Sequence, residues 1–175
     1  VDLIKIAKQK GLPVTADVAM HQLHLTDQLI DGFNSLAHVR PPLRAEQDKE
    51  LLRKGVKEGI IDAICTHHEP LSGSAKLAPF AETLPGISAF DTYVSFGVQL
   101  VREGLFEPLE WVEKVTAAPA KVANMTERWV KESGWALVDP DMEWTVSKDN
   151  IYSNGKNTPL INQKMLGKVV ATFIA

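Results

Sequence analysis

The spacing of apolar residues predicts helices that alternate with short strands along most of the chain. Helices are predicted where apolar residues recur every three or four positions, at 2–10, 45–58, 87–101, 109–115 and 119–125. Strands are predicted where short β-branched or continuously apolar runs lie between turn residues, at 14–19, 36–39 and 60–66. Because strands and helices alternate, the pattern indicates an α/β fold.

The pattern changes near the C-terminus, where short strands follow one another. They are predicted at 135–138, 143–146 and 168–174, with proline, aspartate and asparagine turns between them. We therefore divide the chain into an α/β part, 1–127, and a small β-rich appendage, 128–175. Three parallel strands alone leave open edges and an incompletely covered core, so the α/β part is expected to belong to a larger barrel or sheet.

Composition and charge narrow the class of protein. The chain has 175 residues, of which 45% are hydrophobic and 23% charged, an ordinary globular composition. Its net charge is −3 without a run of like charges, which argues against nucleic acid or an anionic membrane as partner. The single cysteine, Cys65, forms no internal disulfide, so a reducing, cytoplasmic location is expected. The chain begins with Val1, so either an upstream segment was removed or the chain is a fragment.

Histidines follow each of the three predicted strands of the α/β part. His21 and His24 come after the first, His38 ends the second, and His67 and His68 follow the third. In a parallel α/β barrel such positions face the active site. His21, His67 and His68 supply metal ligands only if the strand ends lie side by side. For each histidine taken alone a surface role is the simpler interpretation, and His24 is expected to flank a helix without a ligand role.

Other polar residues allow a chemical and a structural interpretation. Arg40 and Arg44 bracket a double proline and either bind an anionic group bidentately or form surface ion pairs. Asp62 lies at the start of a strand, where a structural role is expected. Cys65 lies inside an apolar strand and is interpreted as a small core residue rather than a nucleophile.

An ordered set of segments resembles the dihydroorotase branch of the amidohydrolase superfamily. The matching segments are 15–18 with His21, 39–44, 59–70, 85–87, 116–121, 157–159 and 167–169. The resemblance implies the last three strands and helices of a (β/α)8 TIM-type barrel, followed by part of a flanking β-rich appendage. The family's paired histidines of the first strand, its bridging lysine and an early histidine ligand all lie upstream of the matching region. Such enzymes use one or two zinc ions to activate the water that opens dihydroorotate.

The sequence departs from the family pattern at the positions that carry the chemistry. In the family, the third of these strands ends Thr-Asp-His-Ala-Pro-His, and its aspartate binds metal and shuttles a proton. Here the segment reads Thr-His-His-Glu-Pro-Leu, so His67 stands at the catalytic aspartate position and Leu71 at that of a substrate-binding histidine. Arg40 replaces a substrate-binding asparagine. His21 keeps a zinc-ligand position, which is insufficient alone.

These departures predict a non-catalytic dihydroorotase-like protein of pyrimidine biosynthesis with no bound cofactor. Loss of a general base alone typically costs ~10²–10⁴-fold in rate. In this family, inactive chains of this type are structural subunits for aspartate transcarbamoylase, whose catalytic subunit is therefore the expected partner; homo-oligomer formation stays open. One alternative is an active zinc-dependent dihydroorotase or other cyclic amidohydrolase with a rearranged site at His21, His67 and His68. Another is a regulatory module that binds an anion or nucleotide through Arg40 and Arg44.

Overall fold

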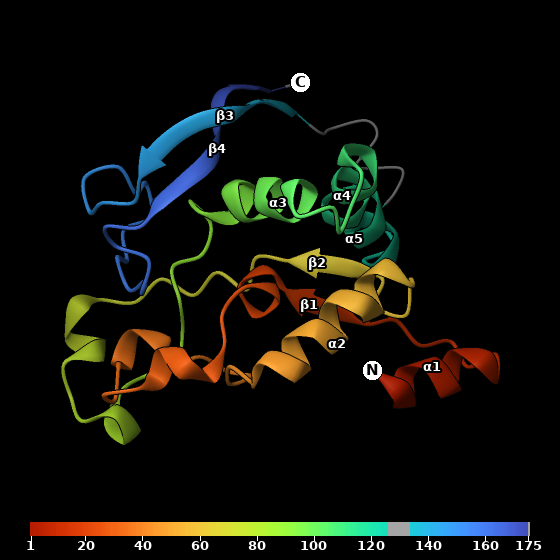
Figure 1. The fold of residues 1–175 in the computed structure, drawn as a ribbon, viewed down its shortest axis with the longest axis horizontal. Helices are drawn as coiled ribbons and strands as arrows, with labels where there is room; N and C mark the ends of the chain where they lie inside the picture. Colours follow the sequence, from red (N-terminus) through yellow and green to blue (C-terminus); the bar gives the residue numbers. More distant parts are fainter. Residues whose placement is uncertain (126–133, 175) are drawn as a thin grey trace.

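The computed structural model describes residues 1–125 and 134–174, which form a two-stranded parallel sheet with helices around it and a two-stranded antiparallel hairpin (Figure 1). The α-helices are α1 (Asp2–Gln9), α2 (Glu46–Lys57), α3 (Tyr93–Arg102), α4 (Pro108–Val115) and α5 (Ala117–Val122). The strands are β1 (Asp17–Ala19), β2 (Ala63–Cys65), β3 (Trp135–Thr145) and β4 (Lys164–Phe173). Short 3-10 helices are η1 (Met20–Leu23), η2 (Asp27–Ile30), η3 (Ser35–Ala37), η4 (Gly73–Lys76) and η5 (Phe80–Glu82). In this described part, no helix has the length and apolar character that crossing a bilayer requires. The expected boundary between 127 and 128 lies outside the described residues.

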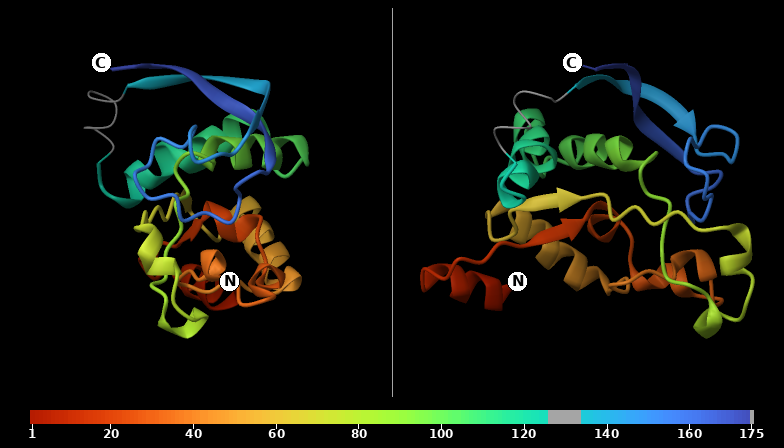
Figure 2. Two further views of the ribbon diagram at one scale, coloured as in Figure 1. Left: turned by 90° about the vertical axis from the view of Figure 1, so that its left-hand side faces the viewer. Right: turned by 180° about the vertical axis from the view of Figure 1, so that it is seen from behind.

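The parallel pair β1 and β2 forms the centre of the core. Val18 pairs with Ile64, and both side chains are buried in the main hydrophobic cluster with residues of α2 and α3. Both helices lie close to this pair of strands (Figures 1 and 2). Asp17 and Cys65 contact each other on the other side of the pair, as the alternation of side chains along a strand requires. The predicted α/β character is therefore confirmed. Most apolar residues of 14–19 and 60–66 are buried: Val18, Ala19, Ile60, Ile61, Ala63 and Ile64.

Helices α3 and α4 approach each other closely because α3 carries a glycine at the contact. A Cβ atom on Gly97 would lie 2.1 Å from Cε2 of Trp111. Trp111 is consequently buried in the main hydrophobic cluster together with Phe96 and Leu100 of α3. Glycine at this point makes room for the indole, which a larger residue would displace.

The hairpin β3–β4 arches over α3 (Figures 1 and 2). Its strands pair antiparallel from Trp135 with Phe173 to Thr145 with Lys164. The two separate strands expected at 135–138 and 143–146 are one irregular strand, with shifts of register on both sides of Val138 and Asp139. Proline at position 140 explains the second of these shifts, between Asp139 and Glu143, because proline cannot donate a ladder hydrogen bond.

The strand predicted at 36–39 is wrong. Residues 35–37 form the 3-10 helix η3, and the backbone N–H of Leu36 is bonded to the side chain of Asn34 at 3.2 Å. The carbonyl of His38 accepts hydrogen bonds from the backbone N–H of Gly86 and from the ammonium of Lys76. The backbone polar groups of Leu36 and His38 therefore form hydrogen bonds within a turn and to other loops, not to a neighbouring strand. In the described residues the parallel sheet accordingly has two strands rather than three.

The helix predicted at 87–101 begins later, at Tyr93. The residues before it pair with the loop that follows β2: Ile87 accepts a hydrogen bond from the backbone N–H of Glu69. The N–H groups of Ala89 and Phe90 donate to the imidazole of His68. Periodicity alone did not reveal these long-range bonds, which hold residues 86–90 in an extended path along the candidate site.

Candidate functional site

The carboxyl ends of β1 and β2 bring two of the predicted histidines together. His21 lies in η1, directly after β1, and His67 lies in the loop after β2. Because the two strands are parallel neighbours, their following residues emerge at the same edge. The ring centroids of His21 and His67 are 6.2 Å apart, with the rings inclined at 72°. The expectation that these strand ends lie side by side is met for this pair.

His21 is a buried, neutral imidazole. Its side chain is 2% exposed, and its Nδ1 atom has no hydrogen-bond partner among the described residues. Burial, followed by the charge of His67, lowers the pKa of His21 to about 4. The neutral form, which is the form that ligates zinc, therefore predominates at neutral pH.

The described residues fit part of a zinc site rather than a complete one. Zinc sites in proteins normally have three or four protein ligands. Within 1–125 and 134–174, no group of three or more His, Cys, Asp or Glu side chains is arranged to hold a metal ion. Among these described residues, His21, with its unpartnered Nδ1, and the neighbouring His67 form a pair of imidazoles at the strand ends that fits part of such a site.

His68 is committed to holding the loop. Its Nδ1 atom accepts hydrogen bonds from the backbone N–H groups of Ala89 and Phe90, both at 3.1 Å. Its Nε2 atom lies 3.4 Å from the hydroxyl of Ser153 in the C-terminal segment. Nδ1 therefore ties the loop after β2 to residues 89–90, and Nε2 brings the same loop next to the C-terminal segment. The ligand role considered for His68 from the sequence is not supported at this nitrogen.

Asn157 fastens the same loop to the C-terminal segment. It is 3% exposed, and its Oδ1 atom accepts a hydrogen bond of 2.7 Å from the backbone N–H of Leu71. Its Nδ2 group donates to the carbonyls of Glu69 at 3.0 Å and Gly86 at 3.1 Å. Sequence reasoning gave Asn157 no role, although it lies in one of the segments that carried the family resemblance. A single buried amide thus fixes the backbone on which His67 and Leu71 lie.

Leu71 and Arg40 occupy different surroundings. The Leu71 side chain packs so closely on Gly86 that a Cβ there would lie 3.1 Å from Cδ1 of Leu71. An aliphatic side chain offers no donor to a substrate carboxylate. Arg40 is exposed, and its charge contributes, after burial and Lys76, to a lowered pKa of His38. The structure therefore places Arg40 beside the segment of η3.

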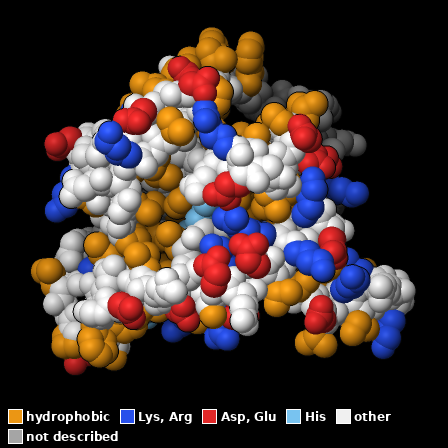
Figure 3. Space-filling model, viewed as in Figure 1, with side chains coloured by type: hydrophobic (Ala, Val, Ile, Leu, Met, Phe, Trp, Pro, Cys, Tyr) orange, Lys and Arg blue, Asp and Glu red, His pale blue; other side chains and the backbone are white. Residues whose placement is uncertain are grey.

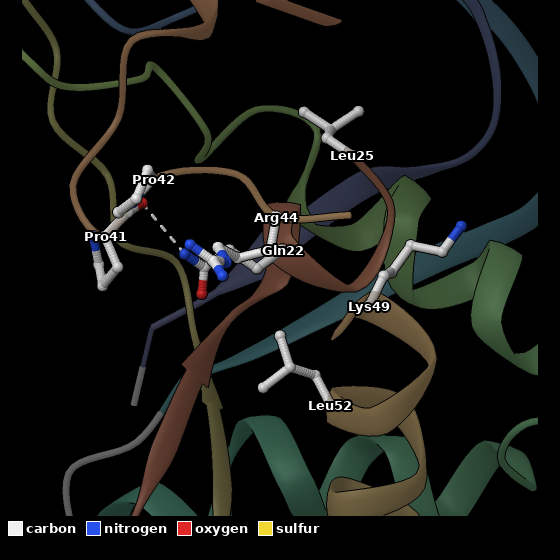
Figure 4. Close-up of a pocket in the computed structure, with 7 residues that line it drawn as sticks. All are labelled: Gln22, Leu25, Pro41, Pro42, Arg44, Lys49 and Leu52. Carbon is white, nitrogen blue, oxygen red and sulfur yellow. Dashed lines mark hydrogen bonds between the residues drawn. The ribbon is translucent and has the colours of Figure 1, made fainter. Parts of the chain in front are cut away.

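Arg44 lines a pocket of about 260 Å³ with Lys49 and Gln22, over the double proline (Figure 4). The Gln22 amide donates to the carbonyl of Pro41 at 3.1 Å. Both cations already have carboxylate partners at the start of α2. The Nε atom of Arg44 lies 3.3 Å from Asp48, and Lys49 pairs with Glu46. An anion bound here would compete with these two carboxylates.

Asp62 and His24 make contacts that hold the fold together. Both carboxylate oxygens of Asp62 lie 2.7 Å from the ammonium of Lys8, and one accepts the backbone N–H of Ala16. Burial opposes ionisation of Asp62, but these hydrogen bonds outweigh it and lower its pKa. The imidazole of His24, at the end of η1, is stacked on Phe96 with ring centroids 4.2 Å apart. Asp62 therefore anchors α1 to the sheet, as its place at a strand start predicted.

Cys65 is an unreactive thiol. Its Sγ atom donates a hydrogen bond of 3.0 Å to a carboxylate oxygen of Asp17. Burial, and then this carboxylate, raise the pKa of Cys65 to about 12. Because the thiolate is the nucleophilic form, the side chain is not activated at neutral pH.

Comparison with known proteins gives relatives over nearly the whole chain. A dihydroorotase-like protein of Pseudomonas aeruginosa is 37% identical over 99% of this chain, and one of Pseudomonas putida is 41% identical over 98%. A dihydroorotase of Syntrophus aciditrophicus is 34% identical over 99%. The chain spans only 41–42% of the length of these relatives. No protein-family model matches the chain.

Solved structures give the same fold at lower sequence identity. A D-hydantoinase (dihydropyrimidinase) from Thermus sp. superposes with a TM-score of 0.88 over 99% of this chain and 40% of its own, at 19% identity. The inactive dihydroorotase-like domain of a Chaetomium thermophilum CAD-like multifunctional protein superposes with a TM-score of 0.68 at 18% identity, over 98% of this chain and 45% of its own. At such identities the likeness concerns the fold alone, which is the α/β fold of these structures.

Proposed function

Because this chain is homologous over nearly all of its length to the dihydroorotase family, we propose that it forms part of a cytoplasmic, dihydroorotase-like protein of pyrimidine biosynthesis that does not hydrolyse dihydroorotate. Its role in this proposal is structural, as a subunit that assembles with aspartate transcarbamoylase. The observation that carries the proposal is the imidazole of His67, which lies beside His21. By the resemblance of its segment to the family, His67 stands in place of the catalytic aspartate.

The proposal includes the finer architecture. Parallel strands are normally covered on both faces, whereas Asp17 of β1 is exposed and Cys65 of β2 is half-buried on the face away from α2 and α3. The relatives are more than twice as long as this chain. We therefore assign the described α/β part to the end of a (β/α)8 barrel, whose remaining units cover this face.

Replacement of the aspartate by histidine removes a negative charge from the reaction centre. A carboxylate beside a metal ion offsets the metal's charge and accepts the proton of the attacking water. A neutral imidazole accepts a proton but supplies no such charge. The side chain of His67 is also exposed, with its backbone in the left-handed region at φ 47°. Loss of the general base predicts a rate lower by ~10²–10⁴-fold.

Substrate contacts are weakened at two further positions. Leu71 has no donor for a carboxylate and packs on Gly86 instead. Arg40, in place of an asparagine, is exposed. A binding site that has lost a polar contact leaves the substrate's polar group unpaired, which costs ~1–3 kcal/mol for each lost bond. Together with His67, these changes reduce both chemistry and binding.

Sedimentation velocity tests the structural role. The full-length protein, mixed with the catalytic subunit of aspartate transcarbamoylase from the same organism, is expected to give a boundary faster than either component at micromolar concentration. Each component alone provides the control. Two unchanged boundaries at that concentration would contradict the assembly role without bearing on catalysis.

A second candidate function rests on the proximity of His21 and His67, whose ring centroids are 6.2 Å apart. In this alternative both imidazoles hold zinc together with ligands from the remainder of the longer protein. When bound, the zinc ion supplies an activated water for hydrolysis of a cyclic amide. Cobalt substitution distinguishes the candidates, since a His67→Ala variant changes the visible spectrum of bound cobalt only if His67 is a ligand.

A further inference from the structure

The C-terminal segment contains the only asparagine–glycine pair of the sequence, Asn154 and Gly155. The pair lies between two contacts that tie this segment to the loop after β2. Ser153 lies beside the Nε2 atom of His68, and Asn157 bonds the backbone of the loop. Figures 1 and 3 show the segment as loops at the open end of the hairpin, at the surface of the described part.

Packing allows only glycine at position 155. A Cβ atom there would lie 2.5 Å from the backbone nitrogen of Leu71 and 2.7 Å from the carbonyl carbon of Pro70. Both are main-chain atoms, so no rotation of a side chain relieves the overlap. The residue after Asn154 therefore has no side chain that obstructs the approach of its backbone nitrogen to the Asn154 amide. The close contact with the loop after β2 thus creates a reactive asparagine–glycine pair.

The Asn154 amide is free to react, in contrast to asparagine side chains that the fold holds. Among residues 1–125 and 134–174, neither the Asn154 side chain nor the backbone N–H of Gly155 forms a hydrogen bond. By contrast, Asn150 forms two hydrogen bonds through its amide, and Asn157 forms three. A bonded amide has to break these bonds before its carbon atom is attacked, whereas the amide of Asn154 does not.

We propose that Asn154 is a site of spontaneous deamidation, which converts it to isoaspartate and thereby loosens the loop after β2. The backbone nitrogen of Gly155 forms a bond to Cγ of Asn154, and the side-chain amide nitrogen leaves as ammonia, which takes the proton that the backbone nitrogen loses. The product is a succinimide ring. One water molecule then opens the ring at either carbonyl, which gives aspartate or isoaspartate. In isoaspartate the main chain runs through Cβ and Cγ, so it is longer by one methylene group.

The added methylene group falls where the structure has little room for it. On one side, Gly155 packs directly on the main chain of residues 70–71. On the other side, Asn157 accepts the N–H of Leu71 at 2.7 Å and donates to the carbonyl of Glu69 at 3.0 Å. A longer chain between these contacts displaces one from the other, because packed groups do not stretch to follow it. All these contacts lie within the described residues, so the inference does not depend on the proposed function.

Peptide mapping of the aged full-length protein tests the modification. Trypsin releases residues 149–156, a peptide that contains both Asn154 and Asn150. After the folded protein is kept at physiological temperature and mildly alkaline pH, Asn154 is expected to be deamidated and Asn150 to be intact, which makes Asn150 the control within the same peptide. Isoaspartate in this peptide is detected by methyl transfer from S-adenosylmethionine with a protein isoaspartyl methyltransferase. Asn154→Gln, whose longer side chain closes the ring poorly, is expected to give no signal there.

Hydrogen exchange at the Leu71 amide tests the consequence. Exchange is expected to be about tenfold faster in the aged wild type, the effect of one lost hydrogen bond on a local opening, and unchanged in aged Asn154→Gln. Freshly purified Asn154→Asp carries the charge without the added methylene group and is expected to leave exchange at Leu71 unchanged. The proposal is overturned if Asn154 stays intact in the folded protein while the urea-unfolded chain converts it. It is equally overturned if isoaspartate forms and exchange at Leu71 stays the same.

Discussion

Substitution of Asn157 by alanine is expected to loosen the loop that carries His67. The variant loses three hydrogen bonds at once: from the Leu71 N–H, and to the carbonyls of Glu69 and Gly86. Only the bond to Gly86 is fully buried, and an unsatisfied buried group costs ~1–3 kcal/mol. The other two are half-buried, so water replaces them in part at ~0.5–1 kcal/mol each. The sum is a destabilisation of about 3 kcal/mol.

Urea unfolding of the full-length protein measures this loss, and hydrogen exchange at the Leu71 amide reports it locally. Asn150→Ala is the matched control, because Asn150 also bonds its own neighbourhood, through Ser147 and Thr145, but does so at the hairpin end. Its effect should be about 1 kcal/mol, with no change in exchange at Leu71. If Asn157→Ala lowers the free energy of unfolding by less than about 1 kcal/mol and leaves the Leu71 amide equally protected, Asn157 does not hold this loop in place.

Three further predictions concern the packing and the charges around the site. Gly97→Ala puts a methyl group against Trp111 and should lower the free energy of unfolding by ~1–3 kcal/mol, whereas Gly73→Ala, with open space around it, should be close to neutral in the same thermal melts. Cys65, whose pKa is raised to about 12, should react with iodoacetamide at pH 7.5 far more slowly in the folded than in the urea-unfolded protein; Asp17→Asn should speed the folded reaction, and equal rates would contradict the assignment. The pKa of Asp62 is lowered in the folded state. Its ion pair with Lys8 therefore stabilises the folded protein at pH values above the pKa of Asp62 in the unfolded chain. This stabilisation is lost as the pH falls through the pKa of Asp62 in the folded protein. Asp62→Asn should therefore cost up to ~1 kcal/mol at pH 7 and nothing at strongly acidic pH, and an equal cost at both would contradict the linkage.

Much of the architecture could be predicted because it depends on local periodicity. The apolar runs around Val18 and Ile64 form the buried parallel pair, and the charged face of 45–58 became the exposed side of α2. The strand at 36–39 failed because the side chain of Asn34 caps a turn there. A side-chain hydrogen bond of this kind competes with strand pairing. The apolar pattern of 36–39 does not indicate that such a bond forms.

The sequence predicted where the candidate site lies but not the hydrogen bonds that hold it together. The parallel strand ends were sufficient to place His21 near His67. The roles of His68 and Asn157 depend on partners far away in sequence, at positions 89–90 and 69–86. No spacing rule reports such bonds. Only the family resemblance at 157–159 marked Asn157, without giving its function.

Dihydroorotate hydrolysis by the full-length protein, with zinc added, tests the central claim most directly. Wild type should be indistinguishable from the zinc-free blank, and a variant that restores the family pattern at His67→Asp, Arg40→Asn and Leu71→His should gain turnover above it. Turnover by the wild type well above the blank, and its loss in His67→Ala, would contradict the non-catalytic assignment and make His67 a working ligand or base.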